Sequence, residues 1–255
     1  ISTTRFTQPA MVAVANMATL LLKKNRITPD YVCGLSLGEY SALSAAGVFD
    51  PETAIQVVRE RGLAMEKAAE GVESAMMAIL GLEREPLLNI CVGCDGYVSI
   101  ANYNCPGQLV IAGEKKAVEE AGQKALDHGA RRAVPLNTSG PFHTKLLKDA
   151  STRLHEVFKN VTFHEMNVPV IFNCTGKELE NCSVQDMLEK QVMSPVYFED
   201  SIRTMINNGV DTMIEIGPGK VLSGFVRKID KKIKTYQVED MASLQKCVEA
   251  LNETK

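Results

Sequence analysis

The chain has 255 residues, of which 45% are apolar, and its formal net charge is −3. A chain of this length can bury a sizeable core as one globular unit or two small lobes, and a charge this small argues against a general nucleic-acid binder. The sequence contains no apolar run of the roughly 20 residues that a membrane-spanning helix needs, and its first residues show no signal-peptide pattern.

The first 72 residues are predicted to alternate helices with one strand, in the order helix 8–24, strand 30–33, helix 39–46 and helix 51–69. Asp50 is expected to cap the last of these helices, because an aspartate followed by Pro51 at the first helical position is a typical helix start. Gly47 and Gly71 provide the stop signals of the two later helices.

The middle of the chain predicts a different kind of unit. Its apolar runs and amphipathic stretches indicate strand 74–80, helix 83–92, strand 97–103, strand 108–112, helix 115–127 and strand 131–136. This β-α-β-β-α-β order is the split βαβ arrangement of ferredoxin-like folds. We therefore expect residues 73–137 to form a small ferredoxin-like lobe.

The remaining residues return to alternating helices and strands, with helices at 145–159, 184–191, 198–208 and 221–229 and strands at 168–173 and 212–216. Such alternation favours a parallel sheet covered by helices on both faces. The predicted fold is thus α/β, with a hydrolase-like parallel-sheet large lobe (1–72 and 138–255) that carries the small lobe as an insertion.

Seven cysteines are scattered without a regular framework: Cys33, Cys91, Cys94, Cys105, Cys174, Cys182 and Cys247. Their odd number and spacing indicate reduced thiols, so we predict a cytoplasmic protein. Cys91 and Cys94 form a single C-x-x-C motif, which could hold a metal or act in redox chemistry. No second pair or nearby histidine supports that alternative, and we predict no metal site.

Ser36 lies in the sequence Gly-Leu-Ser-Leu-Gly at 34–38, between a predicted strand and a predicted helix. A serine flanked by glycines in this context is typical of a nucleophile elbow, a sharp turn whose flanks are expected to need residues without a Cβ. The turn would leave the Leu37 backbone N–H free to stabilise an oxyanion at the start of the helix. The alternative is an ordinary strand-to-helix loop.

A serine nucleophile needs a base, and His143 is the best candidate among four histidines. His143 lies in a loop with glycine and proline that enters a helix, where functional side chains are commonly presented. His128, His155 and His164 occur in polar surroundings and are interpreted as surface residues. A helix-capping role remains the alternative for His143.

Arg61 falls on the apolar stripe of helix 51–69, together with Val58 and Met65. An unpaired charge is costly in such a position. Arg61 therefore either pairs with an internal carboxylate, extends its head to solvent, or binds an anionic ligand. A guanidinium binds a carboxylate through two parallel hydrogen bonds, which suits an acyl group that ends in one.

Together these features resemble the malonyl-CoA:acyl carrier protein transacylases of type II fatty-acid synthesis and the related acyltransferase domains of polyketide synthases. The matching stretches are collinear along nearly the whole chain, at residues 7–10, 34–43, 59–62, 101–108, 140–143, 191–196 and 215–222. The resemblance implies transfer of a malonyl group from malonyl-CoA to the phosphopantetheine thiol of acyl carrier protein. It implies no tightly bound cofactor and no nucleic-acid or membrane partner.

The resemblance also implies roles for individual residues. Ser36 would attack malonyl-CoA in a ping-pong cycle, and His143 would act as base and then as acid. The main-chain carbonyl of Gln191, in place of an aspartate, would orient the imidazole. The Leu37 N–H would hold the oxyanion.

For the substrate, the resemblance implies that Arg61 holds the malonyl carboxylate. Phe142 would disfavour a branched acyl group by steric exclusion, and Asn104 would line the acyl pocket from the small lobe. The basic residues of 227–234 are a candidate docking site for an acidic carrier protein, or simply a solvated face.

Two departures from the family pattern stand out. Leu35 occupies a position where the family often has histidine, with little expected effect. The family also opens with a strand and a Gly-Gln-Gly-Ser-Gln loop that nothing in this sequence matches, so a second oxyanion donor is expected in an N-terminal segment outside these residues. The alternative functions are a polyketide-type trans-acting acyltransferase, a serine thioesterase or other hydrolase, and a silent docking module.

Overall fold

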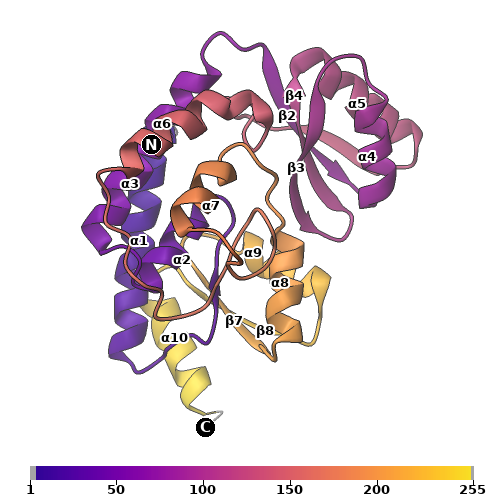
Figure 1. The fold of residues 1–255 in the computed structure, drawn as a ribbon. Helices are drawn as coiled ribbons and strands as arrows, with labels where there is room; N and C mark the ends of the chain where they lie inside the picture. Colours follow the sequence, from indigo (N-terminus) through magenta and orange to yellow (C-terminus); the bar gives the residue numbers. More distant parts are fainter. Residues whose placement is uncertain (1–3, 254–255) are drawn as a thin grey trace.

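The structure is a computed structural model, and it describes residues 4–253. Figure 1 shows two groups of elements along the chain, with the four-stranded sheet of the middle residues set beside a larger helical part. The fold is α/β, as the alternating elements predicted. Within residues 4–253, no helix is long and apolar enough to cross a membrane.

The larger part consists mainly of helices. They are α1 (Thr4–Lys24), α2 (Gly38–Ala45), α3 (Pro51–Ala69), the short 3₁₀ helix η1 (Lys145–Leu147), α6 (Lys148–Phe158), α7 (Val184–Gln191), α8 (Phe198–Asn207), α9 (Val221–Ile229) and α10 (Met241–Asn252). Its strands are β1 (Val32–Cys33), β6 (Val170–Ile171), β7 (Thr212–Ile216) and β8 (Lys234–Val238). Helix α1 packs along α3 (Figure 1).

These strands form two separate parallel pairs in the described residues, β1 with β6 and β7 with β8, where one sheet was expected. A cavity of about 760 Å³ borders both pairs, because residues of β1 and residues of β7 line it. The first pair is also shorter than predicted. After β6, the Phe172 N–H donates to the Lys177 carbonyl and the Asn173 N–H donates to the Glu39 side chain, so the ladder cannot continue.

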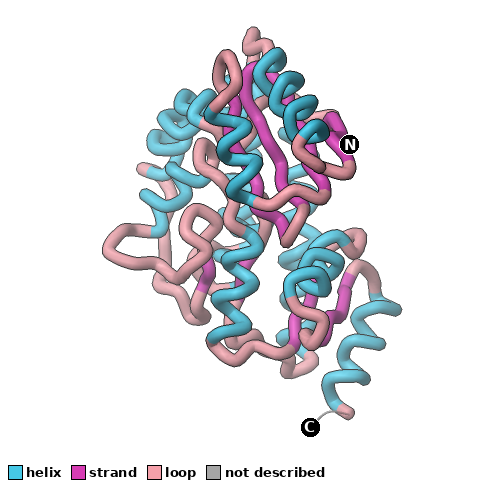
Figure 2. The backbone as a smooth tube through the Cα atoms, turned by 90° about the vertical axis from the view of Figure 1, so that its right-hand side faces the viewer, coloured by secondary structure: helices cyan, strands magenta, loops and turns pink. Residues whose placement is uncertain are grey.

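The middle residues fold into β2 (Ser74–Leu80), α4 (Arg84–Val92), β3 (Val98–Cys105), β4 (Gln108–Glu114), α5 (Lys115–Asp127) and β5 (Arg132–Pro135). The sheet is antiparallel with strand order β3-β4-β2-β5, which is the order of a split βαβ fold. Figure 2 shows the strands in magenta with helices in front of them. One sheet face packs against α4 and α5, and the other against Phe142 of the larger part. The division of the chain at residues 73 and 137 stays a prediction.

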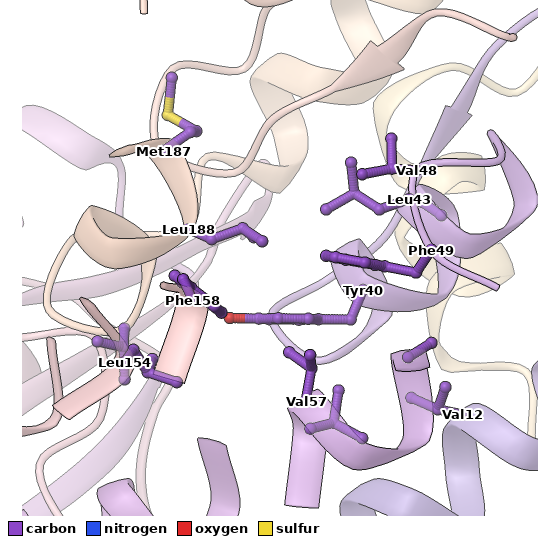
Figure 3. Close-up of a cluster of buried hydrophobic side chains, with 14 of the residues drawn as sticks. Val12, Tyr40, Leu43, Val48, Phe49, Val57, Leu154, Phe158, Met187 and Leu188 are labelled. Atoms are coloured by element: carbon purple, nitrogen blue, oxygen red, sulfur yellow. The ribbon is translucent and has the colours of Figure 1, made fainter. Parts of the chain in front are cut away.

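The main core of the larger part surrounds Tyr40 of α2. Figure 3 shows this ring among apolar side chains of α1, α3, α6 and α7, including Val57 and Phe158. Helix α3 begins as predicted, because the Asp50 side chain accepts a hydrogen bond from the Thr53 N–H and Pro51 follows at the first helical position. The core thereby fixes both α2 and α3, the helices that flank the candidate site.

Candidate active site

Ser36 occupies a strained turn between β1 and α2. Its φ of 54° lies in the left-handed region, which a non-glycine residue enters only at an energetic cost. Gly34 makes the turn possible, because a Cβ at that position would overlap the Gly38 carbonyl. Gly38 itself faces open space, so the expectation that both flanking positions must lack a Cβ is correct only for Gly34.

His143 lies beside Ser36 in the loop before η1. The Ser36 hydroxyl and the His143 Nε2 are 2.7 Å apart, and the His143 Nδ1 lies 3.0 Å from the main-chain oxygen of Gln191 at the end of α7. Since a carbonyl can only accept, Nδ1 carries the proton and Nε2 is free to accept the serine proton. Burial lowers the pKa of His143, and the charge of Arg61 lowers it further, to about 4. The imidazole is therefore neutral near pH 7.

Arg61 is 1% exposed, and its guanidinium reaches the same hydroxyl. One nitrogen donates to Ser36 Oγ at 3.1 Å and to the Gln191 side-chain oxygen at 3.0 Å. The other terminal nitrogen donates to Gln8 Oε1 at 2.9 Å, and the group lies over the Tyr40 ring. Helix periodicity thus correctly predicted the burial of Arg61.

The charge of Arg61 has no carboxylate partner within ion-pair distance in residues 4–253. Glu39 is the acid whose charge acts on it, but burial raises the pKa of Glu39 to about 8 and keeps this carboxyl largely protonated near pH 7. A buried cation surrounded by neutral hydrogen-bond acceptors favours an anionic ligand.

The backbone N–H of Leu37 is available at the start of α2. In the described part of the chain it donates no hydrogen bond, whereas the Ser36 N–H is already bound to Asn173 Oδ1 at 2.7 Å. A free amide next to the serine, at the positive end of a helix, can stabilise a developing oxyanion.

Phe142 and Asn104 lie where the two parts of the molecule meet. Phe142 packs against both the main core and the apolar sheet face of β2, β3 and β4. Asn104 on β3 is 7% exposed, and its side-chain oxygen has no hydrogen-bond partner. Within residues 4–253, no hydrogen bond joins Asn104 to the cluster of Ser36, His143 and Arg61.

The remaining histidines and the cysteines lie outside the Ser36 cluster. His128, His155 and His164 are exposed, as predicted. All seven cysteines are free, including Cys91 and Cys94. No group of three or more histidine, cysteine, aspartate or glutamate side chains in the described residues could hold a metal ion.

Sequence analysis missed the polar residues that support the cluster, namely Gln8, Glu39, Asn173 and the side chain of Gln191. The Gln191 amide donates to the Ser36 carbonyl at 2.7 Å while its oxygen accepts from Arg61. A signal existed for Asn173, because it follows a buried strand of a parallel pair, at the strand end where functional side chains gather.

A strained serine paired with a buried neutral histidine, beside a free amide, defines the active-site arrangement of enzymes that transfer acyl groups through a serine ester. The model of the acyl transferase domain family matches residues 1–251. The chain belongs to this family.

Similar proteins fit this assignment. The chain is 44% identical over 250 residues to malonyl CoA-acyl carrier protein transacylase of Bacillus subtilis, with 96% of the chain and 79% of that protein covered. The solved structure of MCAT from Streptococcus pneumoniae has 44% identity and a TM-score of 0.93, over 97% of this chain and 82% of that one. The structure of the malonyl-transacylase PlMCAT in complex with the type II PKS acyl-carrier protein AntF has 36% identity and a TM-score of 0.94. The match covers 97% of this chain and 82% of that one.

Proposed function

We propose that the protein is a malonyl-CoA:acyl carrier protein transacylase of fatty-acid biosynthesis, which carries the malonyl group as an ester on Ser36. One observation carries the choice of substrate. The buried guanidinium of Arg61 lies 3.1 Å from the Ser36 hydroxyl, in a cluster without a paired carboxylate. A cation this close to the attacking oxygen fits an acyl group whose carboxylate lies one methylene from the reacting carbonyl, as in malonyl.

The first half of the cycle forms the ester. His143 Nε2 takes the proton from Ser36 Oγ, which attacks the thioester carbonyl, while the Gln191 carbonyl holds the Nδ1–H of the imidazolium. The Leu37 N–H stabilises the tetrahedral oxyanion. As the carbon–sulfur bond breaks, His143 returns its proton to the CoA thiolate, which leaves as the thiol.

The second half reverses the roles. The phosphopantetheine thiol of acyl carrier protein enters, gives its proton to His143 and attacks the malonyl ester. Collapse of the second tetrahedral intermediate breaks the bond to Ser36 Oγ, which regains its proton from His143. Arg61 keeps the malonyl carboxylate in place in both halves, so the acyl carbonyl stays within reach of the thiol.

Phe142 and Asn104 complete the proposed acyl pocket. Because Phe142 packs against both parts of the molecule, it narrows the space between them and would exclude a branch on the acyl chain. The unpaired side-chain oxygen of buried Asn104 would accept a hydrogen bond from an amide N–H of the substrate's pantetheine arm, because the malonyl group itself has no donor.

The proposed partner is an acidic carrier protein, in a cytoplasmic setting consistent with seven free cysteines. A basic group at the end of α9 and the start of β8 could attract it, formed by Arg227, Lys228, Lys231, Lys232 and Lys234. The similarity to the complex with AntF supports carrier-protein docking and also favours a second candidate, in which the acceptor is a polyketide carrier protein.

A transfer assay with the full-length protein tests this proposal. Labelled malonyl-CoA and holo-acyl carrier protein should yield malonyl on the carrier thiol, and Ser36→Ala should abolish the product. Release of free malonate at the same rate with and without carrier would instead indicate a hydrolase. Parallel reactions with fatty-acid and polyketide carrier proteins distinguish the two candidate pathways.

A further inference from the structure

The backbone of Ser36 is held by side chains far away in the sequence. Its carbonyl accepts hydrogen bonds from the Gln191 side chain at 2.7 Å and from the Glu39 N–H at 3.2 Å. Its N–H has no partner within helix α2, because Ser36 precedes the helix. That N–H is bound by Asn173.

The Asn173 amide spans the strained turn with two hydrogen bonds of opposite direction. Its Oδ1 accepts from the Ser36 N–H at 2.7 Å, and its Nδ2 donates to the Gly34 carbonyl at 2.6 Å. Asn173 is completely buried, so water cannot replace either bond. An amide suits this place because it offers a donor and an acceptor side by side.

Glu39 in turn fixes Asn173. Its carboxyl oxygen Oε2 accepts a hydrogen bond from the Asn173 N–H, and Glu39 itself is fully buried in the first turn of α2. The Asn173 carbonyl also accepts from the Tyr197 N–H at 2.8 Å. The turn, the start of α2 and the segment after β6 therefore form one closed hydrogen-bond network around the serine.

We infer that Asn173, supported by Glu39, is a positioning residue that holds Ser36 in its strained conformation with the hydroxyl toward His143 and leaves the Leu37 N–H free for the oxyanion. The inference rests on the proposed role of Ser36 as nucleophile. Asn173 acts through the turn, because it contacts the Ser36 backbone and not the hydroxyl. Without the amide, the turn can relax toward an unstrained φ and carry the hydroxyl away from His143.

The first test is Asn173→Ala, measured as the rate of Ser36 ester formation from malonyl-CoA. Because a displacement of about 1 Å can cost on the order of 100-fold in rate, we expect a loss of roughly that size. The KM for malonyl-CoA should stay unchanged, since Arg61 keeps its hydrogen bonds to the Gln8 and Gln191 side chains. The rate of Ser36 phosphonylation by a small fluorophosphonate, which does not need Arg61, should fall in parallel.

Asn173→Asp distinguishes positioning from a general structural role. A protonated aspartic acid can accept from the Ser36 N–H and donate to the Gly34 carbonyl, whereas an aspartate would repel that carbonyl. The activity of this variant should rise as the pH falls from 8 to 6. Because Glu39, with a pKa of about 8, titrates in all three proteins while His143 stays neutral, the rise is measured as the rate of Asn173→Asp divided by that of wild type at each pH. The same ratio for Asn173→Ala should stay constant.

Thr204→Val is the matched control. Thr204 donates to the Gly176 carbonyl at 2.6 Å and so supports the segment after β6 without touching Ser36. We expect this variant to lower the melting temperature and to keep the wild-type rate of ester formation per folded molecule. All rates are therefore normalised to the folded fraction measured by circular dichroism.

The outcomes separate the two proposals. If wild type forms no ester on Ser36, the proposed function fails. If wild type forms the ester and folded Asn173→Ala forms it equally fast, only the positioning role of Asn173 is overturned. That role is also overturned if Asn173→Asp shows the wild-type pH profile, or if Thr204→Val slows the reaction as much as Asn173→Ala does.

Discussion

The Arg61 guanidinium donates a hydrogen bond to the hydroxyl of Ser36, so the buried cation and the attacking oxygen lie 3.1 Å apart. Two elements create this contact. Helix α3 presents Arg61 on its buried face, and the turn after β1 directs Ser36 toward it. The neutral acceptors around Arg61 orient the guanidinium without cancelling its charge.

Arg61→Ala should therefore alter substrate choice more than chemistry. A hydrogen bond to a charged group contributes about 1.5–3 kcal/mol, so malonyl transfer should fall roughly 10- to 100-fold, while acetyl transfer from acetyl-CoA should change little. Arg61→Lys keeps the charge but loses the two-pronged geometry, so its rate of malonyl transfer should lie between those of wild type and Arg61→Ala. The readout is the ratio of kcat/KM for the two thioesters, and equal losses for both would refute the carboxylate role.

Gln191→Glu offers a complementary change at the same place. The new carboxylate would lie where an oxygen already accepts from Arg61 at 3.0 Å, and it would neutralise the guanidinium. We expect a loss of malonyl preference similar to that of Arg61→Ala. The same change removes the N–H that donates to the Ser36 carbonyl at 2.7 Å, so the reactivity of Ser36 toward a fluorophosphonate should also fall, but by less than malonyl transfer. Equal losses in both assays would contradict a separate electrostatic effect on Arg61.

The pH dependence of ester formation should reflect the lowered pKa of His143. The base must be neutral, so activity is present above the folded-state pKa of about 4 and is lost as the pH falls through it. Because Arg61 contributes to this lowering, Arg61→Ala should move the acid limb to higher pH. Fluorophosphonate labelling from about pH 3.5 to about pH 7 measures both profiles, and an unshifted limb would argue against this electrostatic coupling.

The two glycines of the serine turn should respond differently to alanine. At Gly34 a Cβ would overlap the Gly38 backbone, and overpacking of this kind costs about 1–3 kcal/mol. At Gly38 the space is open and φ is not positive, so alanine should be neutral or should stabilise the fold by up to about 1 kcal/mol. Urea unfolding of Gly34→Ala and Gly38→Ala measures whether only the first loses stability. Equal destabilisation of the two variants would show that Gly38 is also constrained.

Much of the site could be predicted because its signals are local. The stripe of helix α3 indicated a buried Arg61, the pair Asp50 and Pro51 marked the start of that helix, and the glycine-flanked Ser36 indicated a sharp turn. The order of elements in the small sheet also followed from alternating apolar patterns.

The remaining features depend on contacts between distant segments. Asn173 is 137 residues from Ser36, and the Gln191 side chain is 130 residues from Arg61, so no periodicity could pair them. Another long-range contact, from the Asn173 N–H to the Glu39 side chain, helps to end β6 after Ile171, which is why the predicted strand over 168–173 was too long. The orientation of the Asn173 side-chain amide at the end of β6 depends on tertiary packing alone.

The most direct test of the proposed mechanism is to identify the covalent intermediate. After brief incubation with malonyl-CoA and no acceptor, peptide mapping by mass spectrometry should find one malonyl group on the peptide that contains Ser36, and none in Ser36→Ala. Addition of holo-acyl carrier protein should remove the group from Ser36 and place it on the carrier thiol. An intact enzyme that transfers malonyl without a Ser36 ester, or that carries the ester on another residue, would contradict the mechanism.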